Sequence, residues 1–170
     1  PLGPVEKPWV ASKIPIKIIT DLNAEHIKTA DPIVDLVNVI TNQLSIFGSH
    51  SKLFTVLSEL YNNALEHGVL KLDSRLKKSD EGFFAYFSQR EEKLAKLEEA
   101  KIIISTEYLP NKNALMIEIK DSGEGFKQHE VSKLENINKS YGRGISLVKE
   151  LCETVEYNQK GNKVNVVFKI

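Results

Sequence analysis

The stretch ELYNNALEHG, at residues 59–68, decides how this sequence is interpreted. It ends the longer run SKLFTVLSELYNNALEHG, in which apolar residues recur at helical spacing, at positions 53, 56, 57, 60, 64 and 65. Asparagine is a poor helix former, because its amide competes for the backbone hydrogen bonds. Two adjacent asparagines, Asn62 and Asn63, therefore indicate either a solvated surface or a helix face that contacts a ligand.

Three polar residues of this stretch follow helical spacing. Residues four apart lie on nearly the same face of a helix, so Glu59 and Asn63 are predicted to be neighbours and His67 continues their row. A carboxylate beside an amide oxygen suits Mg²⁺, which takes hard oxygen ligands and keeps several waters. Glu66 lies near the same face and is a second candidate for a base. The alternative interpretation is a solvent-exposed helix face whose charged residues bind no ligand.

Length and charge limit the class of protein. With 170 residues, of which 41% are hydrophobic, we expect one well-buried core in a single domain over residues 9–170. Residues 1–8 begin with PLGP, which resembles the remnant of a cleaved expression tag, and are assigned to a linker. Lys plus Arg and Asp plus Glu both number 23, so neither nucleic acid nor a membrane is expected as a partner.

The cysteine count and the hydropathy pattern indicate the compartment. Cys152 is the only cysteine, which excludes an internal disulfide and fits a reducing cytoplasm. We expect it in the core, within an apolar helical pattern. No stretch approaches the roughly 20 apolar residues that cross a bilayer, so the sequence predicts a cytoplasmic protein.

Strand and helix patterns are mixed along the chain. The patterns predict strands within 9–21, a helix over 31–44 that begins with Asp31 and Pro32, the helix that ends at Gly68, and a third helix from Gly82 to residue 100. They then predict a hairpin over 101–121, a helix over 145–155 and a closing hairpin over 155–170. The predicted fold class is α+β, a two-layer α/β sandwich with a mixed, mostly antiparallel sheet and helices packed on one face.

Two pairs of glycines follow in the second half. Asp121 comes directly after a predicted strand and precedes Gly123 and Gly125. Glycine lets a backbone approach a flat ligand closely, and a carboxylate there can accept a hydrogen bond from an exocyclic amine. Aspartate and glycine are also common in turns, so this motif alone is weak.

The second pair, Gly142 and Gly144, stands immediately before a predicted helix. Free backbone N–H groups and the helix dipole favour a phosphate at such a position. Arg143 between the glycines either adds charge to that site or is simply exposed. The stretch before it, residues 126–141, shows no periodicity.

The order of these features is more specific than any one of them. A helix with E-x-x-x-N-A-x-x-H, a strand followed by D-x-G-x-G, an aperiodic stretch and a G-x-G that opens a helix resembles the ATP-binding GHKL superfamily of gyrase, heat-shock chaperone, histidine kinase and mismatch-repair ATPases. The NNALEHG wording and the final hairpin resemble the anti-sigma-factor serine kinases. Residues 72–100 are similar to the version fused C-terminally to PPM-type phosphatase response regulators. The resemblance covers about residues 14–170.

This resemblance implies a role for each motif residue. Glu59 would be the catalytic carboxylate, Asn63 would coordinate Mg²⁺, and Asp121 would bind the adenine amino group. Residues 126–141 would form the ATP lid. The remaining nucleotide-binding positions would be His67, Gly123, Gly125, Gly142, Arg143, Gly144 and Asn162. His67 would either approach the phosphates or fix the helix end, and Asn162 stands where the family usually has a threonine.

The resemblance also implies a function. The chain would be an ATP-dependent serine/threonine kinase that phosphorylates an anti-sigma-antagonist (STAS-like) protein in a partner-switching pathway. A sigma factor, a second copy of the chain, and phosphatase and receiver domains in a longer chain are further expected partners. The alternative is a non-catalytic nucleotide-binding module that controls a fused phosphatase or a sigma factor. A histidine-kinase catalytic domain is a third hypothesis.

Overall fold

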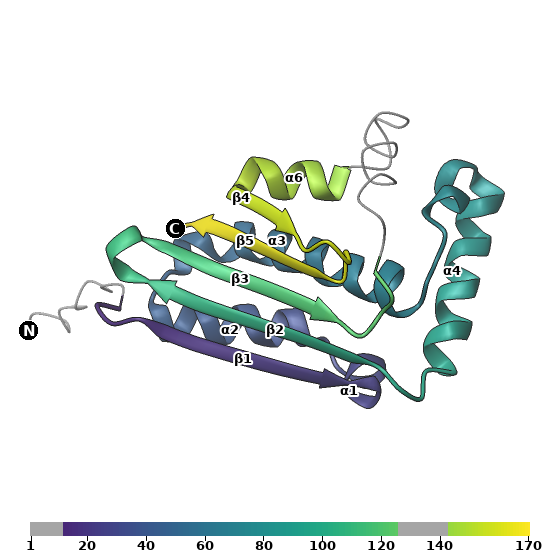
Figure 1. Ribbon diagram of the computed structural model, residues 1–170, viewed down its shortest axis with the longest axis horizontal. Helices are drawn as coiled ribbons and strands as arrows, with labels where there is room; N and C mark the ends of the chain where they lie inside the picture. Colours follow the sequence, from purple (N-terminus) through teal and green to yellow (C-terminus); the bar gives the residue numbers. More distant parts are fainter. Residues whose placement is uncertain (1–11, 126–142) are drawn as a thin grey trace, which may run out of the picture.

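The computed structural model describes residues 12–125 and 143–170 as two layers, a sheet and a set of helices (Figure 1). The sheet has five strands in the order β1-β2-β3-β5-β4, and each described pairing is antiparallel. The strands are β1 (Ile16–Asn23), β2 (Lys101–Leu109), β3 (Ala114–Asp121), β4 (Cys152–Tyr157) and β5 (Lys163–Lys169). This arrangement confirms the predicted α+β sandwich.

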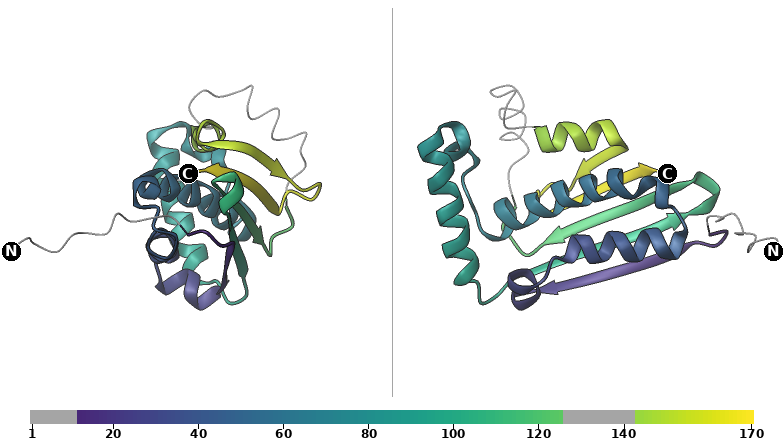
Figure 2. Two further views of the ribbon diagram at one scale, coloured as in Figure 1. Left: turned by 90° about the vertical axis from the view of Figure 1, so that its left-hand side faces the viewer. Right: turned by 180° about the vertical axis from the view of Figure 1, so that it is seen from behind.

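The helices cover one face of the sheet, as the view from behind shows (Figure 2). The α-helices are α1 (Ala24–Thr29), α2 (Pro32–Leu44), α3 (His50–Asn62), α4 (Asp80–Ala95) and α6 (Arg143–Leu151). Short helices are η1 (Phe47–Ser49), η2 (Asn63–Val69), η3 (Ser74–Lys78) and η4 (Pro110–Lys112). α2, α3 and α6 lie along the sheet, whereas α4 stands across its end (Figure 1).

The core lies between the two layers. β2 and β3 alternate between buried and more exposed side chains, so one face of each strand is apolar and points to the helices. The buried side chains of the sheet include Ile102, Ile104, Ile117, Ile119, Val166 and Phe168, and those of α2 and α3 include Val37, Ile40, Leu53, Val56, Leu57 and Leu60. This packing fixes α3, which carries Glu59, against the sheet. In that sheet β3 ends at Asp121.

The N-terminal helices agree with the sequence in part. α2 begins at Pro32 after Asp31, as predicted, although the Asp31 side chain makes no capping hydrogen bond. The strand β1 continues to Asn23, beyond the predicted end at residue 21. The short helix α1 was not predicted. Asn23 caps it, because its side chain accepts a hydrogen bond of 3.0 Å from the backbone N–H of His26.

The predicted bounds of the third helix are wrong. α4 begins at Asp80, so Gly82 lies in its first turn, where its backbone N–H donates to the Oγ of Ser79 over 3.1 Å. A Cβ at Gly82 would lie 2.0 Å from the main-chain oxygen of Leu76. The glycine is therefore there for close packing against η3, and it does not break the helix. The helix also ends at Ala95, five residues before the predicted end at 100.

The predicted helix over 145–155 is also wrong in its second half. α6 ends at Leu151, and Cys152 begins the strand β4. Thr154 and Val155, whose β-branched side chains favour strands, pair with β5. Cys152 is buried, as predicted, but at the start of a strand. The closing hairpin turns where it was expected, with Gly161 at a φ of 80°.

Over residues 12–125 and 143–170, no helix is both long enough and apolar enough to span a membrane.

Candidate nucleotide-binding site

The helix that carries the predicted site changes from α to π geometry at Asn63. The backbone N–H of Asn63 donates to the carbonyls of both Glu59 and Leu60. Farther on, the N–H of Leu70 donates to the carbonyl of Leu65, five residues back, over 2.8 Å. The sequence predicted an ordinary helix that stops at Gly68, whereas η2 passes through Gly68 to Val69. π-Helical turns are rare and are concentrated at functional sites.

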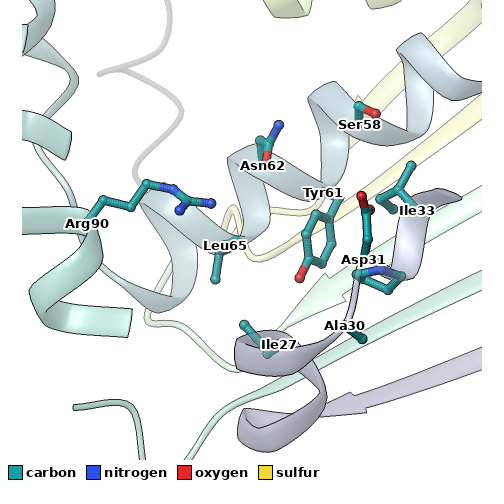
Figure 3. A pocket seen from close by; sticks show the side chains of 10 residues that line it. Ile27, Ala30, Asp31, Ile33, Ser58, Tyr61, Asn62, Leu65 and Arg90 are labelled. Atoms are coloured by element: carbon teal, nitrogen blue, oxygen red, sulfur yellow. The ribbon is translucent and has the colours of Figure 1, made fainter. Parts of the chain in front are cut away.

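The two adjacent asparagines serve different surfaces. Asn63 is half-buried in η2, whereas Asn62 is exposed and lines a cavity of about 300 Å³ on the other flank of α3 (Figure 3). The cavity is lined by Ile27, Ala30, Asp31, Pro32, Ile33, Ser58, Tyr61, Asn62, Leu65 and Arg90. Of the two alternatives for this pair, the exposed surface therefore applies to Asn62, because adjacent side chains on a helix point in different directions.

Asp121 at the end of β3 lies against Gly68 of η2. A Cβ built on Gly68 would lie 2.5 Å from the Cγ of Asp121, and one built on Gly123 would lie 2.3 Å from the main-chain oxygen of Gly68. The backbone N–H of Gly123 donates to the Oδ1 of Asp121 over 2.8 Å. The structure thus joins the end of the ELYNNALEHG stretch to the first glycine motif, and both glycines permit a contact that any side chain would block.

The carboxylate of Asp121 is buried, with 7% of the residue exposed. Burial raises the pKa of this carboxylate above its usual value, against the opposing effects of the Gly123 hydrogen bond and the charge of Lys160. Among the residues that the structure describes, the hydrogen bond from Gly123 goes to Oδ1, so Oδ2 is the oxygen that can face a ligand. A buried carboxylate with one oxygen to offer suits the amino group of adenine.

Asn162 supports Asp121 through the backbone. Its side-chain amide donates to the main-chain oxygen of Asp121 over 3.1 Å, and its own main-chain oxygen accepts from the N–H of Asp121 over 3.0 Å. Asn158 in turn donates to the Oδ1 of Asn162. Gly125, with a φ of 79°, packs against the main-chain oxygen of Lys160, which a Cβ would approach to 1.9 Å. The hairpin turn between β4 and β5 therefore braces the loop after Asp121.

The carboxylate of Glu59 lies at the start of α6. A Cβ built on Gly144 would lie 2.0 Å from the Oε2 of Glu59, so any larger residue at this position would require the Glu59 side chain to shift. A negative charge is favoured at a helix N-terminus. The structure thus places Glu59 beside Gly144 of the second glycine motif. Gly142, the lid at residues 126–141 and the side chain of Arg143 lie outside the described residues.

His67 is engaged at one ring nitrogen. Its Nδ1 lies 3.0 Å from the main-chain oxygen of Leu72, so this nitrogen carries a proton and donates. The N–H of Leu72 donates to the carbonyl of Glu66, which closes the same turn. This geometry matches the alternative in which His67 fixes the end of the helix. A phosphate contact through Nε2 stays a prediction.

Glu66 points toward α4. Its carboxylate accepts hydrogen bonds from the Tyr86 hydroxyl at 2.5 Å, from the Nε of Arg90 at 3.1 Å and from the Nζ of Lys77 at 3.3 Å. Burial alone would raise the pKa of this carboxylate and is the largest single influence, but the Tyr86 hydrogen bond and the charges of Lys77 and Arg90 together lower it. Glu66 is therefore ionised and occupied, which leaves Glu59 as the candidate base.

The residues present fit a magnesium ion bound mainly by its nucleotide. Among residues 12–125 and 143–170, no group of three or more histidine, cysteine, aspartate or glutamate side chains gathers in a way that would hold a metal. Mg²⁺ in nucleotide sites needs only one or two protein groups, with waters and phosphates as its other ligands. Asn63, with Glu59 one turn before it, supplies that number of hard oxygen donors.

The fold and these contacts together define an ATP-binding domain of the GHKL class. Residues 48–168 match the family model of the histidine kinase-like ATPase domain, and the chain belongs to this family. The matched region starts just before α3 and ends within β5, so it includes Glu59, Asn63, Asp121 and Gly144. A comparison with curated proteins finds no match.

Substitution of Gly68 by alanine tests the contact with Asp121. The added Cβ would collide with the carboxylate, so we expect the free energy of unfolding to fall by about 1–3 kcal/mol, as in other overpacked sites. We also expect weaker ATP binding, because the carboxylate must move. Gly48→Ala is the matched control, since a Cβ there meets nothing within 4 Å. Denaturant unfolding and ATP titration measure both effects, and wild-type values for Gly68→Ala would contradict the contact.

Proposed function

We propose that this chain is an ATP-dependent serine/threonine protein kinase of the anti-sigma-factor type. The observation that carries the proposal is the position of the Glu59 carboxylate, at the N-terminus of α6 and one helical turn before Asn63. A kinase needs a base near the transferred phosphoryl group, and a pure nucleotide-binding module does not. Membership of the histidine kinase-like ATPase family supports the use of ATP.

Each residue has one task in this proposal. The Oδ2 of Asp121 accepts a hydrogen bond from the adenine amine, and the close packing of Gly68 and Gly123 holds that carboxylate in place. Asn63 holds Mg²⁺, which when bound neutralises the charge that develops on the phosphoryl group. Glu59 accepts the proton of the attacking hydroxyl. The N-terminus of α6, where Gly144 lies, donates backbone N–H groups to the phosphates.

The proposed substrate is a serine or threonine hydroxyl of an anti-sigma-antagonist (STAS-like) protein in a partner-switching pathway. A sigma factor is the second proposed partner, and a homodimer is the proposed assembly. Support comes from the NNALEHG wording and from residues 72–100, which resemble the domain fused to PPM-type phosphatases. We also propose that a phosphatase domain and a receiver domain lie in the same, longer chain.

One observation favours a second candidate function, that of a docking module regulated by nucleotide. α4 exposes three phenylalanines, Phe83, Phe84 and Phe87, and Phe84 is 76% exposed. The rings of Phe83 and Phe87 pack edge to face with their centroids 4.7 Å apart. Grouped exposed aromatic side chains are uncommon on isolated domains and mark interaction surfaces. A docking module would use this surface without transferring phosphate.

A transfer assay with labelled ATP separates the hypotheses. We expect phosphoserine or phosphothreonine on a purified STAS-like antagonist, in the presence of Mg²⁺ and dependent on Glu59. Phosphohistidine would instead indicate histidine-kinase chemistry. ATP binding without any transfer would favour the docking module, and the absence of ATP binding would refute both nucleotide-dependent functions.

A further inference from the structure

α4 is attached to the rest of the protein by one fully buried side chain and by a set of polar contacts. It stands across the end of the sandwich, and Tyr86 is its fully buried residue (Figure 1). Leu94 is partly buried against the core, Phe84 is largely exposed, and Phe83 and Phe87 are about half covered. Because apolar burial has no preferred direction, the polar contacts of α4 are the ones that orient it on the chain around η2.

Two of the polar contacts of α4, those of Tyr86 and Arg90, converge on the carboxylate of Glu66. We call Glu66 with Lys77, Tyr86 and Arg90 the Glu66 clamp. The side chain of Glu66 is only 13% exposed, and its three donors come from η3 and α4, at 3.3, 2.5 and 3.1 Å. Lys77 also lies over the ring of Tyr86, 4.1 Å from its centroid. Charge-assisted hydrogen bonds of this kind hold a carboxylate in one orientation.

The same helix also holds the chain just after η2. The Nζ of Lys93 donates to the main-chain oxygens of Leu70 and Lys71, at 2.9 and 3.2 Å. Lys71 has a φ of 51°, a left-handed conformation that non-glycine residues seldom adopt. A π turn followed by a left-handed residue persists only where the surroundings hold it in place. α4 and η3 supply part of those surroundings for residues 66–71, and β3 supplies the rest through the packing of Asp121 on Gly68.

The segment held in this way carries nucleotide residues at both of its ends. Asn63 begins η2, and Gly68 packs against the carboxylate of Asp121. Glu66 lies between them in the same turn. The contacts that hold Glu66 therefore act on the segment that joins the residue proposed for the metal to the glycine that packs on Asp121.

We propose that Glu66, Tyr86 and Arg90 are positioning residues, through which α4 holds η2 in the π conformation that binds nucleotide. The claim that this segment binds nucleotide rests on the proposed function. The claim that α4 holds η2 in its π conformation does not depend on it. Binding free energies that are linked act in both directions. Release of α4 therefore weakens nucleotide binding, and bound nucleotide in turn holds α4 more firmly.

Three variants test the proposal. Glu66→Gln keeps the size of the side chain and removes its charge, and Tyr86→Phe removes only the hydroxyl. Glu91→Gln is the matched control, because Glu91 also pairs with Arg90, at 3.2 Å, yet its side chain is 73% exposed and its pairing lies outside η2. We expect Glu66→Gln to weaken Mg-ATP binding by roughly 5-fold to 150-fold, the usual range of coupling between sites. Tyr86→Phe should weaken it less, and Glu91→Gln should match the wild type.

Hydrogen exchange in the nucleotide-free protein gives a second readout. We expect the amides of residues 63–70 to exchange faster in Glu66→Gln and Tyr86→Phe, with β2 and β3 unchanged. If wild-type protein fails to bind Mg-ATP, the proposed function falls, and this exchange still decides whether the clamp holds η2. Unchanged exchange over 63–70 would overturn the proposal. So would wild-type Mg-ATP affinity in a variant that merely melts at a lower temperature. If Glu66→Gln does not fold, Tyr86→Phe provides the same comparison.

Discussion

Glu59→Gln is expected to lower phosphoryl transfer by roughly 100-fold to 10,000-fold, the range for loss of general acid-base assistance. Glutamine has nearly the size of glutamate, so it still fits beside Gly144, and the helix that carries Asn63 is left in place. It cannot take a proton from a hydroxyl. Mg-ATP affinity is therefore expected to stay close to that of the wild type, while transfer to the protein substrate is lost.

Glu66→Gln is the informative comparison for this variant. The chemical change is the same and both residues lie on the same stretch, but the Glu66 carboxylate faces α4. We expect Glu59→Gln to change the rate of transfer at saturating ATP and Glu66→Gln to change the affinity for ATP. Single-turnover transfer and equilibrium titration measure the two quantities separately. Full transfer by Glu59→Gln would mean that positioning alone carries the reaction.

Asp121→Asn is expected to reverse the preference of the site between adenine and guanine nucleotides. Asparagine must keep its oxygen toward the N–H of Gly123, so its NH₂ group takes the place of Oδ2. The NH₂ group can donate a hydrogen bond but cannot accept one from the adenine amine. Guanine carries an oxygen in place of that amine, and this oxygen can accept the hydrogen bond. Loss of a hydrogen bond to a charged group weakens ATP binding by roughly 10-fold to 150-fold. Equal losses for ATP and GTP would assign Asp121 a structural role.

The same variant should unfold at a higher denaturant concentration at neutral pH. Burial raises the pKa of Asp121 in the folded state above the unfolded value, so the folded state binds the proton more tightly. The protein therefore loses stability as the pH rises from the unfolded pKa through the folded one. Asparagine carries no charge, so the variant does not lose stability in this way. Weaker ATP binding together with greater stability is a combination that misfolding cannot produce.

Several parts of the site follow from the sequence because their signals are local. Glu59 and Asn63 are four residues apart on a periodic helix, and Asp121 directly follows a strand pattern. The sequence also allows the prediction that Asn62 and Asn63 point in different directions, because adjacent side chains on a helix diverge. The boundary between α6 and β4 could not be predicted, because the apolar residues of 145–155 fit a helix as well as a buried strand.

Other parts depend on contacts between distant segments. The π geometry of η2 has no local signature in ELYNNALEHG, and the surroundings that α4 provides are visible only in three dimensions. The contact between Glu59 and Gly144 joins α3 to α6, and the one between Gly68 and Asp121 joins η2 to β3. In each case the sequence shows the residue types, and the fold decides which of them meet.

The strand order has a consequence for how the chain folds. β1 pairs with β2 although residues 24–100 lie between them, whereas β2 with β3 and β4 with β5 are short hairpins. Contacts that close long loops slow folding, because the entropy of the loop is lost before the contact forms. The hairpins are therefore expected to assemble first and β1 to join the edge of the sheet late. φ-values near zero along β1 would agree with that order, and values near one would place this strand in the folding nucleus.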